Sequence, residues 1–70
     1  MARQKTKEER LFAAAVVRRS FALRGEEHQA GFRFMYQGVL RDLDLEEQEV
    51  ESYLAAHLEQ VDAAIGRGRP

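Results

Sequence analysis

The amino-acid sequence predicts an all-α fold: a small three-helix bundle, or a helical hairpin with an extra N-terminal helix, completed by homo-oligomerisation. Three observations support this prediction: a length of only 70 residues, apolar residues at helical spacing through most of the chain, and helix-capping patterns before two apolar stretches. A chain of this size buries only ~60% of the surface that its unfolded form exposes, so its own core is marginal. Association with further copies is a common remedy, and we expect it here.

The first predicted helix covers residues 6–24. Thr6 and Glu9 form a T-x-x-E capping box directly before an apolar run, and Gly25 suits the left-handed position that commonly follows a helix. Residues 1–5 are mostly polar and are predicted to form a flexible basic N-terminus. Apolar residues lie on two sides of this helix, which indicates neighbours on more than one side. They are Phe12, Val16 and Leu23 on one side, and Leu11, Ala14, Val17 and Phe21 on the other.

Residues 26–43 fit two interpretations, of which the first is a helix at 27–41. Glu26 and Glu27 would then lie in its first turn, near the positive end of the helix dipole. The spacing of the apolar residues matches a helix at i, i+3, i+4 and i+7. The residues that share this face are His28, Phe32, Met35, Tyr36, Val39 and Leu43.

The second interpretation is a β-hairpin, in which the segment FRFMY alternates and Gln37-Gly38 supplies the turn. Hairpins prefer Asn-Gly or Asp-Gly at that place, which argues against it. Gly31 and Gly38 cost a helix about 1 kcal/mol each relative to alanine. The regular apolar spacing outweighs that cost, so the helix is favoured and the hairpin remains the alternative. Phe34 lies opposite the apolar stripe of such a helix and has no place in an intrachain core.

The last predicted helix covers residues 45–65. Asp44 is expected to cap its N-terminus, with Glu47 as the capping-box partner, and Gly66 is expected to follow its last turn. Residues 66–70 are predicted to be a flexible basic tail, which leaves 6–65 as a single helical domain. A heptad-like seam runs along this helix: Val50, Leu54, His57, Val61 and Ala64.

Two sets of apolar residues follow from these patterns. The predicted core consists of Phe12, Val16, Phe32, Met35, Tyr36, Val39, Val50, Leu54, Val61 and Ile65. The candidates for a surface that contacts another protein chain are Leu11, Val17, Phe21 and Phe34.

Charge is distributed unevenly along the chain. Residues 1–41 hold nine Lys or Arg against four Glu, whereas residues 42–65 hold eight Asp or Glu and no basic residue. Complementary halves orient protein association, which favours a protein partner or a second copy. The alternative is nucleic-acid binding by the first helix and the termini, because the acidic last helix would be repelled by phosphates. The residues that would contact phosphates are Arg10, Arg18, Arg19 and Arg24.

Catalytic and metal chemistry have little support in the sequence. There is no cysteine, which excludes a disulfide framework and cysteine-ligated metal sites, and there is no glycine-rich phosphate loop or nucleophile elbow. His57 is the polar member of the heptad-like seam and is a candidate pH switch, but its more ordinary interpretation is a packed histidine. His28 and His57 lie 29 residues apart without a metal-binding pattern. We expect no enzymatic activity, no metal and no cofactor.

Location follows from the same composition. No apolar run approaches the 18 residues that a membrane span requires. Glu8 and Glu9 interrupt the basic start, and no clean cleavage site follows, which argues against a signal peptide. The sequence therefore predicts a cytoplasmic, non-enzymatic interaction or regulatory module that self-associates, does not bind membranes, and has nucleic-acid binding as the alternative role. The capping boxes and heptad-like spacing are generic to helical proteins and indicate no particular family.

Overall fold

The computed structural model describes residues 6–67, and within them the chain forms four α-helices and no strand. The helices are α1 (Lys7–Leu23), α2 (Ala30–Leu43), α3 (Glu47–Ala56) and α4 (Leu58–Arg67). The predicted all-α class is confirmed, and the helix in the second segment is confirmed over the hairpin. The predicted number of three helices is wrong, because the last one is divided in two. The predicted flexible ends at 1–5 and 68–70 lie outside the described residues.

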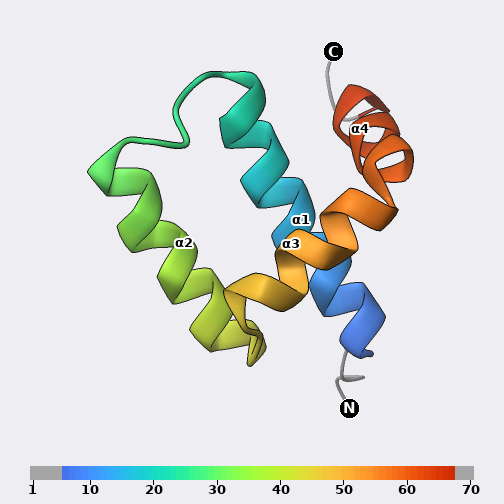
Figure 1. The fold of residues 1–70 in the computed structure, drawn as a ribbon, viewed down its shortest axis with the longest axis horizontal. Helices are drawn as coiled ribbons and strands as arrows, with labels where there is room; N and C mark the ends of the chain where they lie inside the picture. Colours follow the sequence, from blue (N-terminus) through green and yellow to red (C-terminus); the bar gives the residue numbers. More distant parts are fainter. Residues whose placement is uncertain (1–5, 68–70) are drawn as a thin grey trace.

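Helix α1 lies at the centre of the fold and contacts each of the other three helices (Figure 1). In that view α2 lies on one side of α1, while α3 crosses α1 and leads into α4 on the other side. This arrangement agrees with the apolar residues predicted on more than one side of the first helix, because those sides face different helices of the same chain. No helix within residues 6–67 combines the length and apolar character needed to span a bilayer.

Local sequence explains both ends of α1. The capping box is confirmed: the Glu9 backbone N–H donates to Thr6 Oγ1 at 3.1 Å, and the Thr6 N–H donates to Glu9 Oε1 at 2.9 Å. At the other end Gly25 adopts a φ of 70°, the left-handed conformation that glycine tolerates best. The N–H of Glu26 then reaches the carbonyl of Phe21 at 2.9 Å, which closes the last turn.

Helix α2 begins later than the sequence suggests, at Ala30, with Gln29 as its N-cap residue. The prediction that Glu26 and Glu27 occupy its first turn is therefore wrong. Both residues lie instead in the connection where the chain reverses direction between α1 and α2. There the Gln29 N–H donates to the Glu26 carbonyl at 3.2 Å. His28 falls in the same connection with a side chain that is 90% exposed, so it is not part of the apolar face of α2.

The turn between α2 and α3 corrects a second prediction. Asp44 does not cap α3; it ends α2 in the left-handed region, with φ 57° and ψ 51°, which aspartate tolerates better than most residues. The Leu45 N–H donates to the Leu40 carbonyl at 2.9 Å, and the Leu45 side chain is buried. The capping box of α3 lies two residues later than predicted, where the Glu46 N–H donates to Glu49 Oε1 at 3.1 Å. Leu45 is thus buried in the connection between the two helices, and α3 begins only after it, with Glu46 as its N-cap residue.

The predicted continuous helix at 45–65 is interrupted at His57, which has φ −126° and ψ 30°. Its N–H still donates to the Tyr53 carbonyl at 2.9 Å, and its carbonyl accepts from Val61 at 3.0 Å. The bend lets both halves pack on α1, since Val50 of α3 and Val61 of α4 are fully buried in one cluster. Gly66, assigned above to the end of the helix, lies inside α4.

The core contains fewer large side chains than the sequence predicts. Four of its eight buried residues have no exposed surface, and two of these four are the alanines Ala14 and Ala15. The small size of the two alanines lets neighbouring helices approach α1 closely. The other buried residues are Phe32, Tyr36, Leu40, Leu45, Val50 and Val61, of which Leu40 and Leu45 are not in the predicted core. The remaining predicted core residues are partly buried: Phe12, Val16, Met35, Val39, Leu54 and Ile65.

Candidate interaction surface

The most exposed large apolar side chain in the described part of the molecule is Phe34, at 86% exposure. Helix α2 packs Phe32, Tyr36 and Leu40 into the core, and this fixes which side of the helix faces inward. Successive helical residues are 100° apart, so a residue two positions after Phe32 must point away from the core. We call the outward side of this helix the α2 outer face, and it comprises Ala30, Phe34, Gln37, Gly38 and Arg41.

Gly38 has no side chain, so the surface of the helix is recessed in the middle of the α2 outer face. A Cβ built at Gly38 would meet nothing within 4 Å, so packing inside the chain does not require a glycine. Glycine nevertheless costs a helix interior about 1 kcal/mol relative to alanine. The position therefore leaves open space at the site of a missing side chain, one helical turn after the exposed Phe34 ring.

Arg41 supplies the charge of the α2 outer face. Within residues 6–67, Arg41 and its neighbour on the helix flank, Arg33, are the basic residues whose described side chains form neither an ion pair nor a hydrogen bond to another side chain or to the backbone. Both are exposed. The outer face of α2 thus combines an exposed aromatic ring, a glycine with open space above it and a cation that has no ion pair among the described residues.

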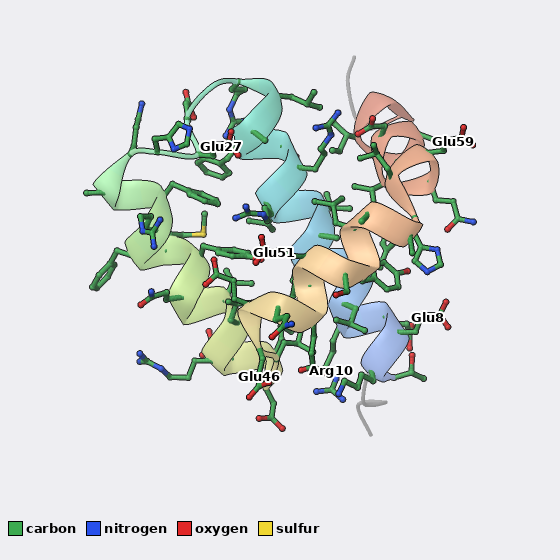
Figure 2. All side chains as sticks on the ribbon, viewed as in Figure 1. Glu8, Arg10, Glu27, Glu46, Glu51 and Glu59 are labelled. Carbon is green, nitrogen blue, oxygen red and sulfur yellow. The ribbon has the colours of Figure 1, made fainter. Side chains whose placement is uncertain are left out.

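Helix α1 presents the opposite situation, because its basic side chains are engaged within the chain. The Arg10 guanidinium donates to the Leu43 carbonyl at 2.7 Å and so ties α1 to the end of α2. Figure 2 shows Arg10 and Glu46 at the same end of the molecule, where α2 turns into α3. Lys7 pairs with Glu49, and this hydrogen bond, together with that from the Glu46 backbone, lowers the pKa of the Glu49 carboxyl.

Arg18 and Arg19 point towards the acidic helices. Arg18 lies 3.7 Å from Glu51 and stacks over the Tyr36 ring at 5.7 Å from its centroid. The Arg19 guanidinium donates two hydrogen bonds, of 2.8 and 3.4 Å, to the Asp62 carboxylate, and this interaction raises the pKa of Arg19. The paired arrangement joins α1 to both α3 and α4.

Arg24, at the end of α1, pairs with Glu26 at 3.2 Å and lies 4.5 Å from the centroid of the Phe21 ring. All four arginines proposed above as phosphate contacts thus have partners inside the chain. Among the acidic side chains labelled in Figure 2, Glu8 and Glu59 lie on the side of the molecule remote from α2, whereas Glu46 lies where α2 turns into α3.

Three of the four apolar interface candidates do not share a surface with Phe34. Leu11, Val17 and Phe21 are partly buried and pack against the chain's own core. Phe21 also contacts Phe32 on the inner side of α2, with ring centroids 4.7 Å apart. The structure therefore leaves Phe34 as the exposed member of that set.

A small cleft of about 110 Å³ lies between α1 and α2, with Arg18, Glu27 and Tyr36 among its lining residues. The Tyr36 hydroxyl is buried and has no hydrogen-bond partner among the described residues. Burial is the main cause that raises the pKa of Tyr36 to about 12, against the opposing effect of the nearby Arg18 cation. A wider, open hollow of about 570 Å³ lies on α1 near Phe12 and Tyr53, with Glu8 and Glu9 at its rim.

The two histidines lie in different surroundings. His57 packs on Tyr53, with ring centroids 4.2 Å apart, and its Nδ1 lies 3.2 Å from Gln60 Oε1. His28 is exposed, with its nearest carboxylate on Glu27 at 3.8 Å. No group of three or more His, Cys, Asp or Glu side chains within the described residues is arranged to hold a metal ion.

Comparison of this chain with models of protein families, with curated proteins and with solved structures gives no match. Its function must therefore be inferred from the geometry and charge of the described residues. Sequence reasoning identified Phe34 but missed Gly38 and Arg41 as its neighbours. Their spacing of four and seven residues from Phe34 on the predicted helix was the signal that could have found them.

Proposed function

We propose that this protein is a small, non-enzymatic helical interaction or regulatory module of the cytoplasm that self-associates through the α2 outer face. The observation that carries the proposal is the 86% exposure of Phe34 on a helix whose opposite side is fixed in the core by Phe32, Tyr36 and Leu40. Burying one phenylalanine side chain against another surface gains about 1.5–3 kcal/mol. Phenylalanine and arginine are also both enriched at protein interfaces relative to the rest of a protein surface.

The charge arrangement supports a protein partner over nucleic acid. A phosphate-binding surface needs basic side chains that are free to contact the backbone of the nucleic acid. On α1, Arg18 and Arg19 are instead held by carboxylates of α3 and α4. Those carboxylates would also repel an approaching phosphate chain.

The size of the face sets the expected strength of association. Helix α2 has 14 residues and is therefore about 21 Å long. A single helix pair of this length buries less than the roughly 1,600 Å² of a standard interface. We expect a weak, concentration-dependent dimer unless flanking residues extend the contact.

The test is the absolute mass in solution, measured by light scattering behind a sizing column over a wide range of protein concentrations. The wild-type chain should pass from monomer to dimer, and Phe34→Ser should remain a monomer with unchanged helical circular dichroism. The matched control is Leu23→Ser, which removes another exposed apolar residue, at 49% exposure, from the end of α1. This variant should associate like the wild type.

Two results would contradict the proposal. A wild-type chain that stays monomeric at every concentration would remove self-association. A Phe34→Ser variant that dimerises as well as the wild type would show that the α2 outer face is not the contact surface.

A further inference from the structure

We infer that the α2 outer face is self-complementary, and that two copies pair with their α2 helices antiparallel. In this arrangement Phe34 of each copy packs against Arg41 of the other, and Gly38 lies beside the two-fold axis. The inference rests on the proposed function, since it specifies the partner and the geometry of the same surface.

The spacing of Phe34 and Arg41 gives the first argument. They are seven residues apart, so they lie on the same side of α2, about 10.5 Å apart along its axis. A two-fold axis that crosses the helix midway between them, at Gln37 and Gly38, exchanges the two positions. Each aromatic ring of one copy then faces the guanidinium of the other, which satisfies both groups at once.

The chemistry of the pair gives the second argument. A guanidinium over an aromatic ring is a favourable contact, and this chain already contains two within the described residues. Arg18 lies over Tyr36 at 5.7 Å, and Arg24 lies over Phe21 at 4.5 Å. Phe34 and Arg41 are exposed and have no such partner among residues 6–67. A parallel pair in register would instead place Arg41 against Arg41 of the other copy, with like charges in contact.

The shape of the face gives the third argument. At the centre of the pair the two backbones must approach closely if the Phe34 rings are to reach the opposite helix. Gly38 provides this space, and none of the residues that the structure describes occupies it. Glu8 and Glu59 lie on the side of the molecule remote from α2, so pairing through α2 keeps these two carboxylates of each copy away from the contact (Figure 2).

The test is a charge cycle at positions 34 and 41, with association measured by light scattering at low and moderate salt. Phe34→Glu alone, and Phe34→Arg combined with Arg41→Glu, each place opposite charges in contact across an antiparallel pair. Phe34→Arg alone, and Phe34→Glu combined with Arg41→Glu, each place like charges in contact. We expect the first two variants to dimerise at low salt, and the last two to associate more than about tenfold more weakly.

The outcomes separate the geometry from the proposed function. In a parallel pair in register, position 34 meets itself and all four variants have like charges in contact, so none would dimerise. That result, with a wild-type dimer that Phe34→Ser disrupts, would overturn the antiparallel geometry alone. A monomeric wild type would overturn the proposed function as well. Circular dichroism of each variant confirms that the monomer remains folded.

A second pair of variants tests the position of the axis. Gly38→Leu adds a side chain at the proposed point of closest approach, and Gly66→Leu is its matched control on α4, where a Cβ also has nothing within 4 Å. Both should keep or raise the stability of the monomer, because leucine favours helices more than glycine does. Gly38→Leu should weaken association more than about tenfold, as expected for a blocked close contact. Unchanged association would place the axis elsewhere.

Discussion

At the scale of single residues, Tyr36 is the least satisfied group in the described core. The side chain is 97% buried, yet its hydroxyl has no hydrogen-bond partner among the described residues. An unsatisfied buried hydroxyl costs about 1–3 kcal/mol, because it has given up its hydrogen bonds with water. Its ring still packs in the core and contacts the Arg18 guanidinium. The ring therefore stabilises the fold, whereas the unpaired hydroxyl destabilises it.

Tyr36→Phe should therefore raise the free energy of unfolding by about 1 kcal/mol. The change keeps the ring in place and removes the hydroxyl alone. Urea unfolding followed by circular dichroism measures the effect, and Tyr53→Phe, at a partly buried tyrosine, is the control. A loss of stability on Tyr36→Phe would show that the hydroxyl is satisfied after all, for instance by a bound water.

The raised pKa of Tyr36 predicts a specific weakness at alkaline pH. An unfolded tyrosine ionises near pH 10, whereas folding holds the pKa of Tyr36 at about 12. The neutral form is the one that folding favours, so the full stability is present below pH 10 and is lost as the pH rises towards 12. The loss should reach roughly 2 kcal/mol.

Tyr36→Phe should flatten this part of the stability profile, measured by urea unfolding at several values between pH 8 and about pH 12. Burial also raises the pKa of Tyr53, so Tyr53→Phe determines that residue's share separately. An identical alkaline decline in the wild type and in Tyr36→Phe would mean that another group causes it.

At the scale of helices, the sequence predicts most elements but not how they end. The Thr6–Glu9 capping box and Gly25 mark α1 correctly, because each acts through hydrogen bonds within a few residues. Asp44 could equally cap a following helix or end a preceding one. The choice depends on the burial of Leu45, which is a tertiary contact.

The bend at His57 also arises from tertiary packing. No glycine or proline lies between residues 45 and 65, so local preference alone favours one continuous helix. The chain bends because α3 and α4 both pack on α1, whose fully buried Ala14 and Ala15 allow close approach. Small buried residues are poor signals in a sequence, since alanine is common on every face of a helix.

Val61→Asp should disrupt the fold, because Val61 is fully buried and the new carboxylate would have no partner in the core. We expect a loss of about 4 kcal/mol or more, comparable to the entire stability of a domain of this size. Ala55→Asp is the control, since it adds the same charge at an exposed position on α3. Circular dichroism and thermal melting should show an unfolded Val61→Asp and a folded Ala55→Asp.

At the scale of the whole molecule, the uneven charge of the sequence becomes an internal property of the fold. The complementary charge of the two halves was predicted to orient association with a protein partner or a second copy. The structure pairs Arg18 with Glu51 and Arg19 with Asp62 inside one chain. The sequence alone does not predict the whole α2 outer face. Its apolar spacing marks Phe34, but only the structure shows that the arginines of α1 have partners inside the chain, whereas Arg41 has none among the described residues.

This pairing predicts the behaviour of the arginines of α1. Arg18→Ala combined with Arg19→Ala should lower the melting temperature by a few degrees and should make stability less dependent on salt, since exposed ion pairs are screened. Association should be unaffected, because neither residue lies on the α2 outer face. Fluorescence anisotropy with a short labelled DNA duplex should show no binding at low salt. Tight binding that the double substitution abolishes would favour the nucleic-acid role instead.

The open position of α2 has one further consequence, for the motion of its backbone. The helix is supported by the core on one side, and Gly31 and Gly38 weaken it from within. Such a helix should open locally at a smaller free energy than α1, and its amide hydrogens should exchange with solvent sooner. A second copy on the outer face would cover the other side of α2. Slower amide exchange that spreads along α2 as the protein concentration rises would then report association directly, and α1 would serve as the internal reference.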